Sequence, residues 1–266
     1  MKKMSHIKTG LLVFICTVGL SFNAFGEGTA NGAKIGTTGE EADNKAEVIK
    51  KKIKCSFEEA SGTKSGEQGE RQEYMSEHLA KVFSQLYPEI EQKEMQHIVA
   101  QGMAETDAAR LVKEEQSKYA SSRSEFKGRG LCQTTHKDNY AKLAGCEKVI
   151  KKYPFPSQIP LAEFSKPQKD TGSDIVSDPE KVSREDDERS KMLAAIGCIC
   201  YFMEQRERHP SLKDYLKRDD DKAVREVGVT LNKGPGKLDT GAKPLGEEKR
   251  KKMFDKAGRC FDGPAT

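Results

Sequence analysis

The sequence predicts a mainly α (α+β) domain over residues 70–262, with one small β-hairpin. Apolar residues recur every three or four positions through most of this region, which is the period of an amphipathic helix. Residues 117–136 contain Ser, Gly and few apolar residues, which fits an irregular loop followed by a short hairpin. A long loop is predicted over residues 152–180, which contain Pro154, Pro156, Pro160, Pro167 and Pro179.

The expected helices follow from the spacing of apolar residues. The first carries Met75, Leu79 and Leu86 and ends before Pro88, because proline cannot continue a helix. In chain order, the helices are expected at residues 75–86, in a segment ending at Glu105, at 137–144, 184–206, 212–216 and 222–231, and in an amphipathic segment ending at Cys260.

Residues 1–26 have the pattern of a bacterial export signal. Three lysines are followed by an apolar stretch from Leu11 to Phe22, which is short for a membrane span, and small residues follow at Ala24 and Gly26. We expect a secreted or periplasmic protein without stable membrane insertion after cleavage; an uncleaved anchor is the alternative. Residues 27–69 are rich in Gly, Ser, Thr, Glu and Lys, which predicts a flexible arm.

The charge of the chain does not indicate a nucleic-acid partner. Of the 266 residues, 35% are hydrophobic and 33% are charged. Removal of three lysines with the signal segment lowers the formal charge of +4 to +1. The basic run Lys249–Lys252 is expected to be a solvated helix face. We expect a monomer that needs no cofactor.

The cysteines favour disulfides over a metal site. One of seven lies in the signal segment, and the remaining even number in an exported chain predicts disulfide pairs. Cys132 and Cys146 flank the short helix after the hairpin and are the one pair expected. Cys198, Cys200 and His209 suggest zinc instead, but a single residue between cysteines is poor zinc spacing; no metal is therefore expected.

Three segments combine glycines with polar side chains that suit catalysis or sugar binding. They are Ala100-Gln101-Gly102-Met103-Ala104-Glu105-Thr106; Gly128-Arg129-Gly130-Leu131-Cys132-Gln133-Thr134-Thr135 followed by Asn139-Tyr140; and Asp174-Ile175-Val176-Ser177-Asp178-Pro179 followed by Leu231-Asn232-Lys233-Gly234.

In this order the segments resemble those of the family 19 glycoside hydrolases, the chitinases and their lysozyme-like relatives. The resemblance covers roughly residues 75–260, and the Gly-Arg-Gly and Gln-x-Thr spacing is its most specific part. It implies a lysozyme-like helical catalytic domain whose hairpin lines a substrate cleft. Two departures are Ala104, where the family has His, and a segment between Glu105 and Gly128 that is shorter than in plant-type members.

The resemblance implies that Glu105 is the catalytic acid. A helix-end Glu walled by apolar residues, here Val99 and Met103, can remain protonated because burial raises its pKa. The general base is not in a recognisable motif; Glu125, just before the Gly-Arg-Gly turn, is the best candidate. Thr135 matches a hydroxyl that helps to hold the attacking water.

Four further residues are expected to bind substrate. Gln133 and Asn139 resemble the amides of the family that contact sugar, and Asn232 matches an amide on the opposite wall. Tyr140 offers a ring on which a sugar could stack. Arg129 is expected to anchor the hairpin by hydrogen bonds.

The sequence therefore predicts an exported glycosidase that cleaves β-1,4 bonds of amino-sugar polymers. Peptidoglycan is the preferred substrate and chitin the runner-up; the absence of Trp argues against crystalline chitin, which is usually gripped by flat aromatic platforms. The same motifs would also suit a lytic transglycosylase, which works with one carboxyl group, or a catalytically inactive cell-wall-binding module.

Overall fold

The computed structural model has a mainly α-helical fold, as the sequence predicts. It describes residues 39–62, 64–85, 87–111, 113, 128–135, 139–140, 143, 178–183, 185 and 187–263. These belong to one compact unit, Thr37–Thr266, and 74% of them are helical. The predicted signal segment, Glu125 and Cys146 lie outside the described residues.

The helices lie close to the positions expected from apolar spacing. Their bounds are α1 Gly39–Ser61, α2 Gly66–Gln85, α3 Gln92–Thr106, α7 Glu188–Arg208, α8 Pro210–Leu216, α9 Asp221–Lys233 and α10 Glu247–Asp262, with short 3-10 turns η2 Pro179–Val182 and η3 Pro235–Lys237. Residues 139, 140 and 143 are helical, in agreement with the short helix expected there.

Polar side chains fix several helix starts. The carboxylate of Asp187 accepts the backbone N–H of Ser190 at the start of α7, and Asp220 accepts that of Ala223 at the start of α9. Each bond satisfies an N–H that has no partner inside the helix.

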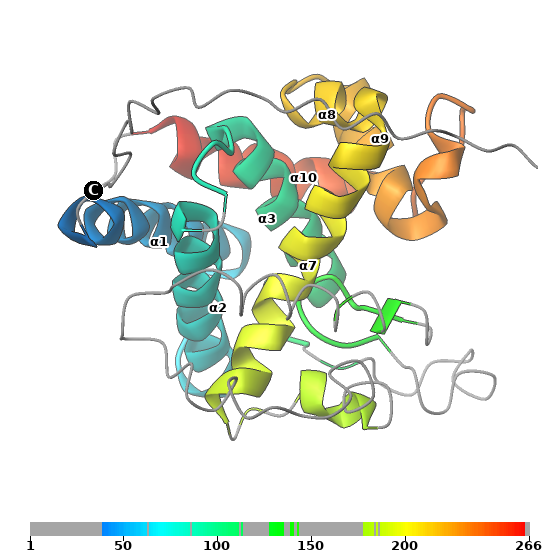
Figure 1. The fold of residues 1–266 in the computed structure, drawn as a ribbon. Helices are drawn as coiled ribbons and strands as arrows, with labels where there is room; N and C mark the ends of the chain where they lie inside the picture. Colours follow the sequence, from blue (N-terminus) through cyan, green and yellow to red (C-terminus); the bar gives the residue numbers. More distant parts are fainter. Residues whose placement is uncertain are drawn as a thin grey trace, which may run out of the picture. The chain divides into compact units, whose positions relative to one another are not determined.

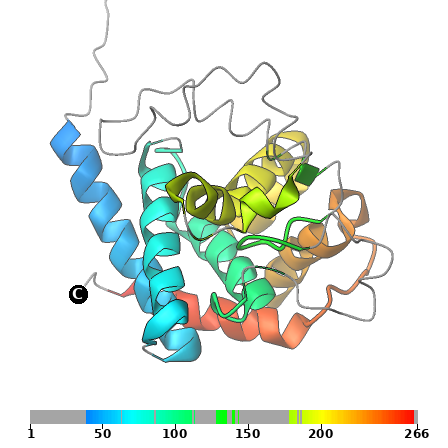
Figure 2. The same ribbon diagram turned by 90° about the horizontal axis from the view of Figure 1, so that it is seen from below.

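The expected flexible arm over residues 27–69 is wrong from Gly39 onward, because α1 is part of the core. Ile49, Ile53 and Phe57 recur every fourth residue and are buried. In both views α1 lies beside α2 (Figures 1 and 2), and it also packs against α10, to which the disulfide Cys55–Cys260 joins it. The overall polarity of the segment hid this apolar stripe.

Helix α3 is the central element of the described residues. It contacts α1, α7, α8, α9 and α10, and lies between α10 and α7 in both views (Figures 1 and 2). All of its residues except Gln92, Lys93 and Glu105 are buried. A polar side chain at its C-terminal end is therefore held by the best-packed part of the domain.

The expected β-hairpin is not confirmed, and residues 128–135, the described part of that segment, form a tight turn. No strand occurs among the described residues, and the pairing is limited to isolated bridges from Arg129 to Thr134 and to Lys113. Arg129 N–H donates to the carbonyl of Thr134, and Thr134 N–H donates back.

The cysteines form disulfides, which confirms that prediction, but the expected pair is wrong. Cys132 is joined to Cys198 of α7, not to Cys146. Cys200 is also in a disulfide. With both cysteines of the Cys198-Ile199-Cys200 segment oxidised, a zinc site there is excluded, because zinc requires thiolates.

The described residues contain no cluster of three potential metal ligands, and no helix among them is long and apolar enough to cross a bilayer.

If α1 belongs to the core, Ile53→Ala should lower the free energy of unfolding by about 2–4 kcal/mol, the cost of deleting a buried side chain. Val48 is on the same helix and is 45% exposed, so Val48→Ala is a matched control and should change stability by less than about 0.5 kcal/mol. Urea denaturation measures both values. Equal, small effects of the two changes would mean that α1 is not packed in solution.

A buried histidine should make stability depend on pH. The His97 ring is fully buried, lies 4.3 Å from the Phe254 ring between centroids, and its Nε2 donates to the carbonyl of Arg218 at 2.6 Å. Burial lowers the pKa of His97 to about 4. The unfolded chain, with an ordinary pKa near 6.5, binds more protons between these values. The stabilisation is therefore complete above pH ~6.5 and is lost as the pH falls toward ~4.

We expect His97 to account for a loss of about 1–2 kcal/mol of unfolding free energy between pH ~7 and pH ~5. His97→Gln should be less stable at neutral pH and should show a smaller loss on acidification. Urea titrations of both proteins at the two pH values measure this difference. An unchanged pH dependence in the variant would show that His97 is not the titrating group.

Candidate active site

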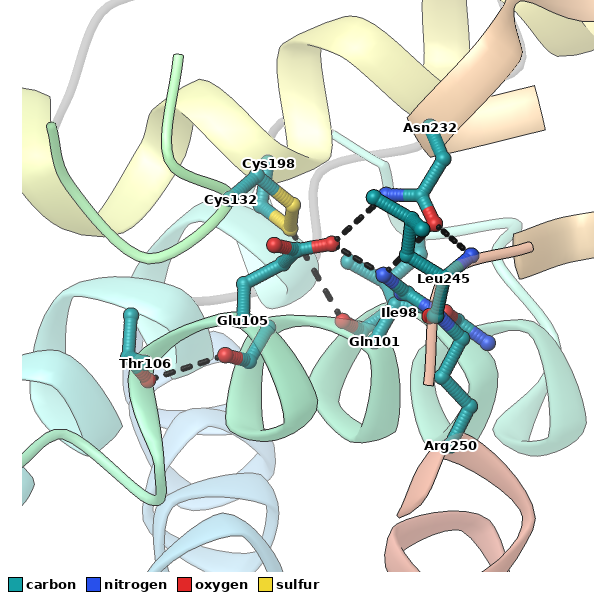
Figure 3. A network of polar contacts seen from close by, with 10 residues as sticks. Ile98, Gln101, Glu105, Thr106, Cys132, Cys198, Asn232, Leu245 and Arg250 are labelled. Carbon is teal, nitrogen blue, oxygen red and sulfur yellow. Dashed lines mark hydrogen bonds and ion pairs between the residues drawn. A yellow bond between two sulfur atoms is a disulfide. The ribbon is translucent and has the colours of Figure 1, made fainter. Parts of the chain in front are cut away.

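Glu105 lies in the last turn of α3 and is the centre of a polar cluster. Its side chain is 19% exposed. One oxygen, Oε1, accepts a hydrogen bond from Asn232 Nδ2 at 3.0 Å and pairs with the guanidinium of Arg250 (Figure 3). The other oxygen, Oε2, has no hydrogen-bond partner in the described part of the chain. Segments 127 residues apart, the ends of α3 and α9, thus meet at one carboxyl group.

Arg250 holds this cluster together. Its side chain is only 4% exposed. One terminal nitrogen donates to Gln101 Oε1 at 2.5 Å; the other donates to Asn232 Oδ1 at 3.0 Å and also contacts Glu105. Its Nε donates to the carbonyl oxygen of Leu245 at 2.8 Å, while the Leu245 N–H donates to Asn232 Oδ1 at 2.8 Å. A buried guanidinium is stable only when such partners replace water.

The charge of Arg250 offsets two unfavourable features of Glu105. A carboxylate at the C-terminal end of a helix faces the negative end of the helix dipole. Partial burial also removes water that would solvate the charge. A guanidinium in contact with Oε1 compensates for both.

The expected apolar wall is not on the same side of α3 as Glu105. At about 100° per residue, Val99 and Met103 lie about 120° and about 160° around the helix from Glu105. Both are fully buried in the core. Gln101, four residues before Glu105, shares its face and belongs to the cluster. The surroundings of Glu105 are therefore more polar than the sequence suggested.

The chain leaves α3 in an unusual conformation directly after Glu105. Asp107, Ala108 and Ala109 all have left-handed φ angles, between 54° and 66°, which non-glycine residues rarely adopt. The Ala108 carbonyl accepts hydrogen bonds from Gln68 and Gln72 of α2, at 3.1 Å and 3.0 Å. These amides help to hold the strained turn, and with it the end of α3.

The Gly-Arg-Gly turn packs directly on α3. A side chain at Gly102 would lie 2.4 Å from the Leu131 side chain, so glycine lets the turn approach the helix one turn before Glu105. A side chain at Gly130, which has a φ of +71°, would lie 2.7 Å from the carbonyl oxygen of Ala194 in α7. Leu131 N–H donates to the Ala194 carbonyl at 2.7 Å. The turn is therefore fixed between α3 and α7, and Cys132–Cys198 adds a covalent link (Figure 3).

The predicted site residues on this turn and just after it differ in how deeply they are buried. Gln133 is partly buried, and its Nε2 donates back to the Gly130 carbonyl at 3.0 Å. Thr135 and Asn139 are partly exposed. Tyr140 is fully buried and its hydroxyl accepts a hydrogen bond from Arg129, so it has no surface for a sugar and is not a substrate contact.

Arg129 has the structural role that the sequence predicted. It is buried, donates to Tyr140 at 2.9 Å and pairs with Glu180 at 2.5 Å. Lys113 also pairs with Glu180, at 2.7 Å. Partial burial acts to raise the pKa of Glu180, but the hydrogen bonds and charges of the two cations together hold it below its usual value. This network joins the turn to η2, and within the described ranges no hydrogen bond or ion pair joins it directly to Glu105.

Arg250 is the member of the site that sequence reasoning missed. The run Lys249–Lys252 suggested a solvated face, and three of its four residues are at least partly exposed. Arg250, however, shares the buried stripe of α10 with Met253, Phe254, Ala257 and Phe261. That spacing places it on the apolar face and could have identified it as a buried cation.

Comparisons with models of protein families, with curated proteins and with solved structures find no match to this chain.

Removal of Arg250 should be costly, because it leaves the Glu105 carboxylate without its counter-charge. We expect Arg250→Met to lower the free energy of unfolding by about 3 kcal/mol, as for other buried pairs that lose one partner. The neighbouring Lys249 makes an exposed ion pair with Asp107 at 3.3 Å, so Lys249→Met should cost less than about 1 kcal/mol.

The double variant Glu105→Gln/Arg250→Met tests whether the two charges act on each other. It should be more stable than the sum of the single changes predicts. Denaturant titrations of the four proteins provide the comparison. Strict additivity would mean that the Glu105–Arg250 contact contributes nothing in solution.

Proposed function

We propose that this protein is an exported glycosidase that cleaves β-1,4 bonds of amino-sugar polymers, with peptidoglycan as its substrate and Glu105 as its proton donor. The observation that carries the proposal is the convergence on Glu105. The ends of α3 and α9 and the start of α10 are far apart in sequence but meet at one partly exposed carboxyl group, and the Gly-Arg-Gly turn packs on α3 one turn before it. Apart from α10, these elements come from the three segments that resemble family 19 glycoside hydrolases.

The geometry of the carboxyl group suits an acid that acts on a bound ligand. Hydrogen bonds from Asn232 and Arg250 are directed at Oε1, so the carboxyl plane is fixed while Oε2 remains for the proton. Glycosidic bond cleavage requires that proton to move to the leaving oxygen. The carboxylate that remains is then stabilised by donors that are already in place, which is the form of electrostatic catalysis that costs no reorganisation.

The proposed reaction needs a second group besides Glu105. Glu105 would give its proton to the leaving oxygen in the substrate complex, where a bound sugar excludes water. Its partner in the reaction would be a carboxylate about 6.5–9.5 Å away if water is the nucleophile. Glu125 remains our candidate for that base, with Thr135 helping to orient the water.

Glu105→Gln should reduce cleavage of purified peptidoglycan by about 10²-fold or more, because an amide cannot donate the required proton. The amide oxygen can still accept the hydrogen bond from Arg250, so circular dichroism should show an unchanged helical fold. Asp107→Asn is the matched control: it removes a carboxylate two residues further on, and it should keep most of the activity. A Glu105→Gln protein with more than about a tenth of wild-type turnover would contradict the assignment.

The products of the wild-type reaction distinguish the candidate activities. Hydrolysis adds water, whereas a lytic transglycosylase forms an anhydro sugar that is about 18 Da lighter. A parallel digestion of chitin tests the runner-up substrate. Binding to peptidoglycan without any product would favour the inactive cell-wall-binding module and overturn the proposal of an enzyme.

A further inference from the structure

Leu245 is an unusual residue beside Glu105. Its side chain is 75% exposed, and Val48 of α1 is the one other large hydrophobic residue exposed within the described ranges. Isolated exposed leucines are common on protein surfaces and need no explanation by themselves. Leu245 differs from such isolated leucines in its position, because its backbone N–H and carbonyl both form hydrogen bonds with residues of the Glu105 cluster.

The backbone of Leu245 is held from several directions. Its N–H donates to Asn232 Oδ1 and its carbonyl accepts from Arg250 Nε, each at 2.8 Å (Figure 3). The preceding Pro244 is buried and packs over Gly228 of α9. The following Gly246 has a left-handed φ of +66° and caps the start of α10. Leu245 is thus anchored in a fixed place next to Asn232, with its side chain in solvent.

A sugar-binding site needs apolar surface, and among the residues that the structure describes the usual source is scarce. Sugars normally stack on aromatic rings. The chain has no Trp, and every described Phe and Tyr is buried or only partly exposed, including Tyr140. An aliphatic side chain anchored at the site can meet the same need for a small apolar group. In an amino-sugar polymer, the acetamido methyl is such a group.

We propose that Leu245 is a specificity-determining residue that contacts the acetamido methyl group of the substrate and so favours N-acetylated over de-N-acetylated glycan. This inference rests on the proposed glycosidase function and refines it. The hydrogen bonds of Leu245 to Asn232 and Arg250 set the position of this apolar contact relative to the proton donor. Loss of the contact should weaken binding of the acetylated sugar without changing the chemistry at Glu105.

The test compares glycan strands prepared from peptidoglycan with the same strands after chemical de-N-acetylation. The wild type should have the lower KM for the acetylated strands. Leu245→Ala should raise that KM about four- to tenfold, the loss expected for a methyl-sized apolar contact, with kcat little changed. On de-N-acetylated strands the variant should match the wild type. Leu245→Met should restore the preference, because it restores an apolar side chain of similar size.

Val48→Ala is the matched control, since it truncates the other exposed hydrophobic residue and should leave both KM values unchanged. Denaturant midpoints of the variants exclude misfolding as the cause of any loss. Three results would overturn the proposed role of Leu245 while leaving the proposed glycosidase function intact. They are equal effects of Leu245→Ala on both substrates, no effect on either substrate, and a wild type that shows no preference. A wild type that cleaves neither substrate would overturn the proposed function, and this inference with it.

Discussion

The packing of α10 against α3 and α9 depends on how the guanidinium of Arg250 is satisfied. This one side chain of α10 reaches Gln101 and Glu105 on α3, Asn232 on α9 and the backbone of Leu245. A buried cation cannot lose these partners without a large free-energy cost, so the partners must remain in register with one another. The interaction that would position a catalytic acid is therefore also the one that joins three helices.

Small residues have the complementary role of letting backbone segments approach. Gly102 accommodates Leu131, and Gly130 accommodates the backbone of Ala194. These contacts bring the Gly-Arg-Gly turn to the end of α3 that carries Glu105. Gly102 and Gly130 are therefore positions at which a larger side chain would push these segments apart.

Helices that follow from the spacing of apolar residues could be predicted from the sequence. Burial and contacts that depend on distant segments could not. The helices containing Met95 and Met192 follow from apolar spacing alone. Helix α1 is hard to recognise in the sequence, because the polarity of its whole segment masks the spacing of Ile53 and its neighbours. Arg250 was hidden by its basic neighbours, and Tyr140 looked like a ligand-binding ring because burial by distant segments cannot be read from a motif. The position of Glu105 was anticipated, but its polar surroundings were not.

The place of α1 in the core has a consequence for how the chain acquires its structure during synthesis. Cys55 and Cys260 are separated by 205 residues, and α1 packs against α10, the last helix of the described chain. Ile53 and Phe57 are therefore made well before α10, and part of their surroundings arrives only when α10 has been synthesised. Until then the domain lacks one wall of its core, and a chain that stops before α10 leaves apolar surface available for aggregation.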